Sequence, residues 1–136
     1  MEIKSLKISG DATKREWAVY LFLATPKNKT EPIKLYVGKV GDNRDGCNPV
    51  ISRIGNHFSY NKVHSQIRNK IEKPEEYDYE YFYCQFGKYE DDIEIRFVSK
   101  QKINELESFT KNFCSFLSKL LTFAVPKNWI SHVCSN

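Results

Sequence analysis

EWAVYLFLATPKNKTEPIKLYVGKV (residues 16–40) sets the architecture of this chain, because it predicts two adjacent strands and the loop between them. Its two ends, 16–24 and 33–40, are rich in β-branched and aromatic residues, a composition typical of strands. The intervening TPKNKTEP contains proline, asparagine and threonine, which favour turns and loops. The stretch therefore predicts an antiparallel hairpin with a long loop.

The segments that follow predict helices and further strands around this hairpin. NPVISRIGNHFS (48–59) and NKVHSQIRNKI (61–71) carry apolar residues at helical spacing. YDYEYFYCQFG (77–87) and DIEIRFVS (92–99) have the alternation and the aromatic or β-branched content of two more strands. The segment 100–124 is expected to form a long helix. The expected fold class is α+β, with a small, mainly antiparallel sheet flanked by helices.

Two of these predicted helices have apolar faces that indicate how they would pack. In 61–71 the apolar residues on one face are Val63, Ile67 and Ile71. In 100–124 the expected buried face consists of Ile103, Leu106, Phe109, Phe113, Phe116, Leu117 and Leu120. Both faces are expected to pack against the sheet, because apolar side chains at this spacing lie on one side of a helix.

Length and composition exclude several classes of protein. With 136 residues the chain is expected to form a single domain over residues 1–136. Hydrophobic residues make up 40% of the chain, which excludes an intrinsically disordered protein. No apolar run approaches the ~20 residues that a membrane helix needs. The N-terminus also lacks the apolar stretch of a signal peptide, so we expect a cytoplasmic protein without membrane contact.

The charge of the chain is unevenly distributed. The net charge is +4, from 21 Lys and Arg against 17 Asp and Glu, and this small excess decides little alone. The cations outnumber the anions between residues 27 and 70, whereas the segment 72–96 is rich in acidic residues. A basic first half suits a partner that carries phosphate groups.

Several polar residues are expected to meet at one end of the predicted hairpin. Tyr20 and Tyr36 sit at matching points of the two strands, so their hydroxyl groups could converge. Arg53 and His57 are four residues apart on the next helix and therefore share a face, which differs from its apolar face. Lys39 lies at the end of the second strand. This set suits a phosphodiester, whose hydrolysis needs a deprotonated nucleophile and a stabilised oxyanion.

AVY (18–20), YVG (36–38), Lys39 and RIGNHF (53–58), taken in this order, resemble the GIY-YIG nuclease family. The first two tripeptides give that family its name, and its next helix carries an arginine followed four residues later by a tyrosine or histidine. The likeness covers nearly the whole chain in the order of elements, but only a few short motifs in letters. It implies a metal-dependent endonuclease that hydrolyses DNA, in restriction, mobile-element or repair processes.

The resemblance also implies one Mg²⁺ or Mn²⁺ ion bound by a glutamate on a later helix. LESF (106–109) offers Glu107 for this role, and Glu105 is close enough to compete. A single carboxylate is typical of Mg²⁺, which keeps several waters and takes other ligands from phosphate. The family places an asparagine about a dozen residues after the glutamate, whereas this chain offers Asn128 much later.

The family likeness implies a role for each of the other residues. Tyr20, or a water-bridged group near it, would act as general base, and Arg53 would stabilise the charge of the phosphorane. Tyr36, Lys39 and His57 would orient the phosphate or relay protons. Which of these groups is the base stays open.

Further contacts to nucleic acid would come from outside these motifs. Lys62 and His64 form either a second basic contact or a solvated face. The chain contains no zinc finger or helix-turn-helix pattern. Specificity would therefore come from the loops 25–34 and 41–48, from a homodimer or from a partner protein.

Two alternative functions remain compatible with the sequence. One is a catalytically inactive nucleic-acid-binding domain on the same scaffold, which would need no metal. The other is a protein-interaction domain whose contact surface is the acidic, tyrosine-rich KPEEYDYEYFY (73–83), because exposed tyrosines are favoured at interfaces.

Overall fold

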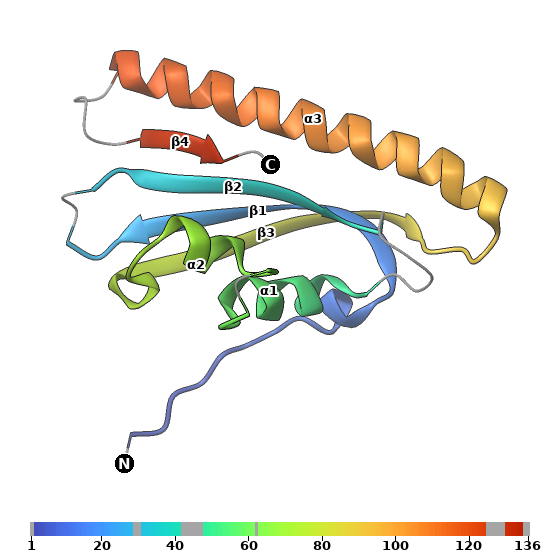
Figure 1. Ribbon diagram of the computed structural model, residues 1–136, viewed down its shortest axis with the longest axis horizontal. Coiled ribbons are helices and arrows are strands. Elements are labelled where there is room, and N and C mark those ends of the chain that lie inside the picture. The colour runs from blue at the N-terminus through green and yellow to red at the C-terminus, as the bar shows by residue number, and fades with distance from the viewer. Residues whose placement is uncertain (1, 29–30, 42–47, 62, 125–129, 135–136) are drawn as a thin grey trace.

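The computed structural model describes residues 2–28, 31–41, 48–61, 63–124 and 130–134 (Figure 1). The strands are β1 (Glu16–Pro26), β2 (Ile33–Val40), β3 (Tyr77–Lys88) and β4 (Ile130–Cys134). The helices are α1 (Val50–Phe58), α2 (Gln66–Lys70) and α3 (Ile93–Ala124), with 3₁₀ turns η1 (Gly10–Thr13) and η2 (Pro74–Glu76). These elements form an α+β fold, as the sequence predicted.

One sheet with the strand order β3-β1-β2-β4 organises the molecule. β1 pairs antiparallel with both β2 and β3, which confirms the predicted hairpin and the strand predicted over 77–87. β4 joins the other side of β2 in the parallel direction and was not predicted. In the hairpin, Tyr20 lies opposite Gly38 and Phe22 lies opposite Tyr36. Tyr20 and Tyr36 are therefore diagonal neighbours, and not directly opposite as expected.

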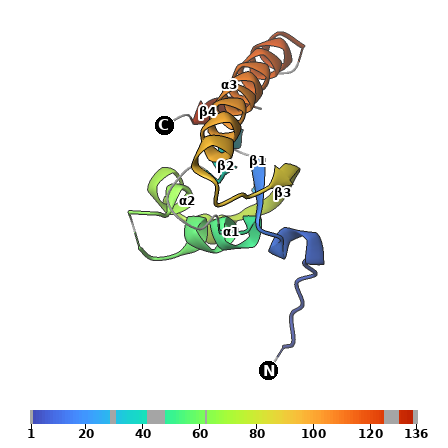
Figure 2. The ribbon, with the colours of Figure 1, turned by 90° about the vertical axis from the view of Figure 1, so that its right-hand side faces the viewer.

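Helices cover the two sides of the sheet (Figures 1 and 2). In the view of Figure 1, α1 lies below the strands, α2 overlaps β1 and β3, and α3 runs along β2 and β4 above them. The alternation of β1 contributes to this arrangement, because Tyr20 and Phe22 are buried on one side of the strand and contact His57 of α1. The core is made mainly of side chains from β1, β2, α1 and α3, with Ile67 of α2 and Tyr77 of β3. Its largest fully buried apolar side chains are Phe22, Val37, Val40, Val50 and Ile103.

The strand predicted over 92–99 is wrong, because this segment forms the first turns of α3. Asp92 caps the helix: its Oδ1 atom accepts hydrogen bonds from the backbone N–H groups of Glu94 at 2.9 Å and Ile95 at 3.0 Å. A short run of β-branched residues is ambiguous between strand and helix. The cap before the run was the local signal that favoured a helix.

The buried face predicted for 100–124 is also partly wrong. Ile103 is buried, but Leu106, Phe109 and Phe113 are 42%, 68% and 51% exposed. The side of α3 that packs on the sheet carries Ile103 and Cys114, so these three side chains lie on a neighbouring side of the helix. Phe116, Leu117 and Leu120 lie in the part of α3 whose side chains are not described.

The helix predicted over 61–71 is shorter in the structure, where α2 covers only Gln66–Lys70. Ile67 and Ile71 are buried as expected, whereas Val63 lies before the helix and is 77% exposed. The helix predicted over 48–59 is confirmed as α1.

Candidate active site

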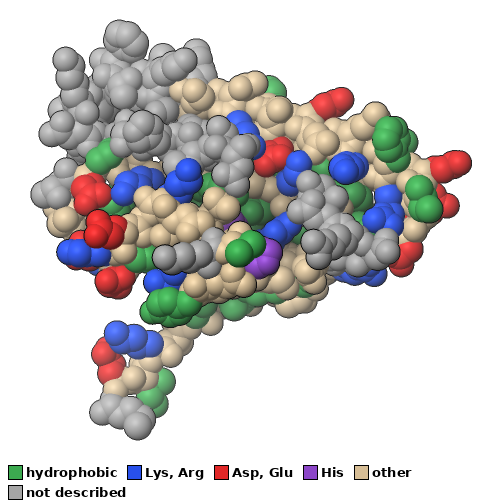
Figure 3. Space-filling model, viewed as in Figure 1, with side chains coloured by type: hydrophobic (Ala, Val, Ile, Leu, Met, Phe, Trp, Pro, Cys, Tyr) green, Lys and Arg blue, Asp and Glu red, His purple; other side chains and the backbone are tan. Residues whose placement is uncertain are grey.

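A pocket of about 340 Å³ lies between α1, the middle of β2 and α3. Lysine, arginine and histidine side chains gather near the middle of this face of the molecule (Figure 3). The pocket is lined by all six residues predicted to act in catalysis or metal binding, namely Tyr20, Tyr36, Lys39, Arg53, His57 and Glu107. The fold therefore brings together residues that are up to 87 positions apart in the sequence.

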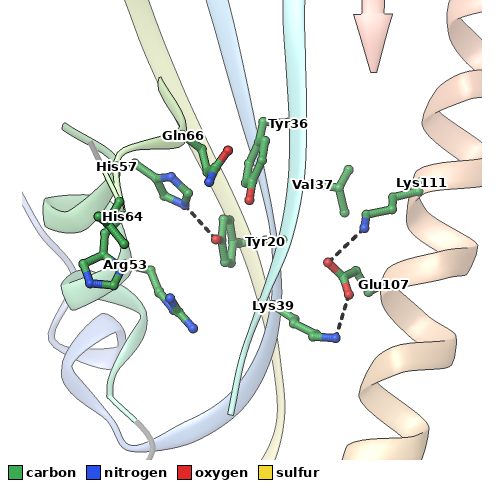
Figure 4. Close-up of a pocket in the computed structure, with 12 residues that line it drawn as sticks. Tyr20, Tyr36, Val37, Lys39, Arg53, His57, His64, Gln66, Glu107 and Lys111 are labelled. Carbon is green, nitrogen blue, oxygen red and sulfur yellow. Dashed lines mark hydrogen bonds and ion pairs between the residues drawn. The ribbon is translucent and has the colours of Figure 1, made fainter. Parts of the chain in front are cut away.

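The alternation of β2 explains how these residues meet. Residues 36–39, in the second half of β2, line the pocket. Alternation along β2 places Tyr36 on the side of α1, where its ring lies 5.0 Å from that of His57. It places Lys39 on the side of α3, in contact with Glu107. The pocket thus receives side chains from both faces of the sheet (Figure 4).

Tyr20 and His57 form a buried pair on the α1 side. The Tyr20 hydroxyl lies 2.7 Å from His57 Nε2, and each residue is only 4% exposed. Burial raises the pKa of Tyr20 well above its ordinary value. Burial, together with the nearby charge of Arg53, lowers the pKa of His57 to about 4. Both groups are therefore neutral at pH 7 and share one hydrogen bond.

His57 sits in a box of aromatic rings, which explains its burial. The rings of Tyr20, Phe22 and Tyr36 lie within 5.0 to 5.6 Å of the imidazole and meet it edge to face. Its Nδ1 atom is buried and has no hydrogen-bond partner among the residues that the structure describes. The prediction that Arg53 and His57 share a face distinct from the apolar face of α1 is therefore only partly right, because His57 packs among apolar rings.

The glycine of the YVG tripeptide has a packing role. Gly38 lies opposite Tyr20, and a Cβ atom at this position would overlap the Tyr20 ring and its hydroxyl oxygen. Any larger residue would displace this ring from the pocket. Gly38 therefore allows Tyr20 to lie flat on β2 and to reach His57.

α2 fixes the end of α1 that carries His57. The Ser65 hydroxyl donates a hydrogen bond to the backbone oxygen of His57 at 2.5 Å and accepts one from the backbone N–H of Arg68. Arg68 Nε donates to the backbone oxygen of Phe58 at 2.9 Å. Because Ser65 is fully buried, this link holds the imidazole against Tyr20 without taking part in the pocket.

Two further predicted contact residues border the pocket, one on α1 and one between α1 and α2. Arg53 is half-buried and projects from α1 toward the strands (Figure 4). Its charge lowers the pKa of both Tyr20 and His57, although burial dominates both shifts. His64 is exposed and lines the same pocket. Lys62 and Asn128 lie outside the described residues.

Glu107 occupies the α3 side of the pocket and is held by two lysines. Its Oε2 atom lies 3.0 Å from Lys39 Nζ, and its Oε1 atom lies 3.2 Å from Lys111 Nζ. Lys39 also donates a hydrogen bond to Asn104 Oδ1 at 2.6 Å. Glu105 is exposed and does not line this pocket, so the geometry favours Glu107 over Glu105.

Lys111 and Asn104 were not predicted from the sequence. Lys111 follows Glu107 by four residues, and a Glu and Lys at this spacing on a helix form an ion pair. That spacing was visible in the sequence. The contact of Asn104 with Lys39 joins α3 to β2 across 65 positions, and no local pattern indicates it.

The donor set of the pocket fits a metal ion that is only partly held by protein. Among the described residues no group of three or more His, Cys, Asp or Glu side chains could hold a metal ion. Glu107 is the acidic side chain of the pocket, and each of its oxygens has a second lone pair beside the one facing a lysine. Glu107 could thus contribute one ligand to Mg²⁺ or Mn²⁺, and water and phosphate would supply the rest.

The low pKa of His57 predicts a loss of stability in mild acid. Because this pKa of about 4 lies below the ordinary value of 6.5, the unfolded chain binds a proton more readily than the folded protein. The contribution of neutral, buried His57 to the free energy of unfolding is fully present above pH 6.5 and is lost as the pH falls from 6.5 toward 4. At pH 5 it should reduce the free energy of unfolding by about 2 kcal/mol.

Urea unfolding at pH 5 and at pH 7.5 measures this effect. We expect His57→Gln to flatten the pH dependence of the free energy of unfolding by that amount, even if it lowers stability at both pH values. An unchanged slope in His57→Gln would show that His57 is not buried in its neutral form.

Comparisons of the chain with protein-family models, curated proteins and solved structures found no match. In the part of the chain that the structure describes, no helix combines the length and apolar character needed to cross a bilayer.

Proposed function

We propose that this protein is a metal-dependent endonuclease that hydrolyses phosphodiester bonds in DNA. The proposal rests on one observation: polar side chains from both faces of the sheet converge near residues 36–39 of β2. A neutral Tyr20–His57 pair lies on one side, Glu107 with its two lysines lies on the other, and Arg53 borders the same pocket. A proton acceptor, fixed positive charge and one carboxylate are what phosphodiester hydrolysis requires.

The Tyr20–His57 pair would remove a proton from the attacking water. Tyr20 passes its phenolic proton to His57 Nε2 as it accepts the proton of the water, so neither group must ionise beforehand. His57 becomes positively charged while negative charge forms on the phosphorane, and the two charges stabilise each other. This assigns the general base to the pair, with Tyr20 in contact with the water.

Fixed cations would stabilise the charge that develops on phosphorus. Arg53 carries a planar guanidinium that can donate two parallel hydrogen bonds to phosphate oxygens. Lys39 is anchored by Asn104 and Glu107, so its ammonium group is held at the edge of the pocket. Donors that are already in place cost no reorganisation when the charge develops.

Glu107 would hold a divalent ion, Mg²⁺ or Mn²⁺, at the α3 side of the pocket. When bound, such an ion polarises a phosphoryl oxygen and neutralises part of its charge. Tyr36 lies beside Tyr20, with ring centroids 6.2 Å apart, and would orient the phosphate with its hydroxyl group. Action in the cytoplasm, and a homodimer or partner protein that supplies specificity, belong to the same proposal.

The structure gives little support to residues 73–83 as a protein-interaction surface. Tyr77 is buried, and Tyr79, Tyr81 and Tyr83 are half-buried against the core. Tyr81, for example, packs on Phe22 with ring centroids 4.4 Å apart. The tyrosines of 73–83 are therefore mainly occupied in packing and do not form the exposed contact surface that the sequence suggested.

Incubation of purified protein with supercoiled plasmid tests the proposal. We expect nicked and linear DNA in Mg²⁺ or Mn²⁺ and intact plasmid in EDTA. A fluorescently labelled duplex in EDTA should bind with an affinity that falls steeply as salt rises, because phosphate contacts release counterions. Salt-dependent binding without cleavage in either metal would identify an inactive nucleic-acid-binding domain. Absence of binding at any salt concentration would remove both nucleic-acid functions.

A further inference from the structure

The two oxygens of Glu107 face two different ammonium groups (Figure 4). Lys39 Nζ lies 3.0 Å from one oxygen, and Lys111 Nζ lies 3.2 Å from the other. The three side chains are 16% to 21% exposed, so water screens these ion pairs less than fully exposed ones. All three residues line the pocket. Glu107, the proposed metal ligand, is therefore occupied by cations in the free protein.

The two lysines are held differently. Lys39 has a second partner in Asn104, whose Oδ1 atom accepts its hydrogen bond at 2.6 Å. Lys111 has no partner besides Glu107 within the described residues, and its long side chain is anchored one helical turn away. Loss of the Glu107 contact therefore leaves Lys39 in place, whereas Lys111 is free to turn toward another anion.

This arrangement disfavours binding of a divalent metal ion when no phosphate is bound, and binding of a phosphate when no metal ion is bound. A divalent cation that approaches Glu107 meets two ammonium groups about 3 Å from the carboxylate oxygens. A phosphate that approaches the lysines meets a carboxylate that already compensates their charge. Each ligand removes the obstacle to the other, because phosphate attracts Lys111 away and a metal ion neutralises Glu107.

We propose that Lys111 is an exchangeable counterion that couples metal binding to phosphodiester binding. In the free protein Lys111 occupies Glu107, and when DNA and metal bind it moves to a phosphate oxygen of the DNA. The inference rests on the proposed nuclease function. It adds Lys111 to the site and makes binding of the metal ion dependent on binding of the DNA. The metal ion binds tightly only together with the phosphodiester, and the coupling is reciprocal.

Calorimetric titration of Mn²⁺ into the DNA-free protein is the first test. Lys111→Gln should lower the dissociation constant for Mn²⁺ roughly three- to tenfold, because one competing charge beside Glu107 is gone. Lys102→Gln is the matched control, since Lys102 is exposed on the same helix and does not line the pocket. Lys111→Arg keeps the charge and should bind Mn²⁺ as the wild type does.

The second test measures DNA affinity without metal, by fluorescence anisotropy of a labelled duplex in EDTA. Glu107→Gln should bind the duplex several-fold more tightly than wild type, because both lysines lose their competing carboxylate. Glu105→Gln removes the same charge from an exposed position outside the pocket and should bind with nearly wild-type affinity. Equal affinities of the Glu107 and Glu105 variants would contradict the coupling.

The two tests separate failure of the coupling from failure of the nuclease proposal. Mn²⁺ binding that persists in Glu107→Gln would remove the metal site on which both proposals depend. Mn²⁺ binding that is lost in Glu107→Gln but unchanged in Lys111→Gln would overturn the role of Lys111 alone. Thermal unfolding of each variant shows whether it is folded, and Lys111→Met offers a second uncharged substitution if Lys111→Gln is not.

Discussion

Replacing Glu107 with glutamine should reduce metal-dependent cleavage of DNA by roughly 10³-fold or more. A metal ion that polarises a phosphoryl oxygen contributes several kcal/mol of transition-state stabilisation, and each 1.36 kcal/mol corresponds to a factor of ten in rate. Glutamine has nearly the same size and shape as glutamate but lacks the charge that would anchor the ion. The rate should be measured under single-turnover conditions with a labelled duplex and saturating Mg²⁺.

The control for this prediction is Glu105→Gln. Glu105 is two residues away on the same helix, is exposed and lies outside the pocket, so its variant should cleave at nearly the wild-type rate. The Glu107 variant should still show a cooperative unfolding transition, because glutamine has nearly the size of glutamate and its amide oxygen can still accept a hydrogen bond from a lysine. Loss of cleavage in the Glu105 variant, with the Glu107 variant active, would mean that Glu105 binds the metal ion and Glu107 does not.

Replacing Arg53 with alanine should lower the cleavage rate by roughly 10²–10³-fold while DNA affinity changes far less. The phosphorane carries more negative charge than the bound phosphodiester, so a guanidinium held by α1 stabilises the transition state more than the ground state. Arg53→Lys should restore only part of the rate, because a single ammonium group cannot reproduce the planar arrangement of donors.

Lys70→Ala is a suitable control for Arg53→Ala. Lys70 is exposed on α2 and does not line the pocket, yet its loss changes the net charge by the same amount. Nearly equal rates for wild type and Arg53→Ala would mean that Arg53 is part of a solvated helix face. A second readout is the pKa of His57 by NMR, which should rise in Arg53→Ala, since the charge of Arg53 helps to lower it.

Local sequence patterns predicted the elements that contain the site. Alternation gave the hairpin of β1 and β2, and with it the shared side of Tyr20 and Tyr36. Helical spacing gave α1 and the four-residue separation of Arg53 and His57. These features depend on neighbours within a few residues, so one sequence is enough to predict them.

The same patterns failed where packing between distant segments decided the outcome. The run 92–99 suits either a strand or a helix locally, and its continuation into α3 made it helical. Leu106, Phe109 and Phe113 have helical spacing, but the sheet contacts the neighbouring side of α3 that carries Ile103. Periodicity predicts that a helix has an apolar side, but it does not show which side another element will cover.

The sequence by itself determined which residues are present, on which strand or helix Tyr20, Tyr36, Arg53 and His57 lie, and that these four would share one side of the molecule. Only the tertiary structure decided that Tyr20 bonds to His57, that β4 pairs with β2, and that Glu107 and Lys111 reach the pocket. The physical reason is the range of the interactions. Backbone hydrogen bonding and side-chain periodicity are local, whereas burial, strand edges and ion pairs across the sheet arise only when segments far apart in the chain pack together.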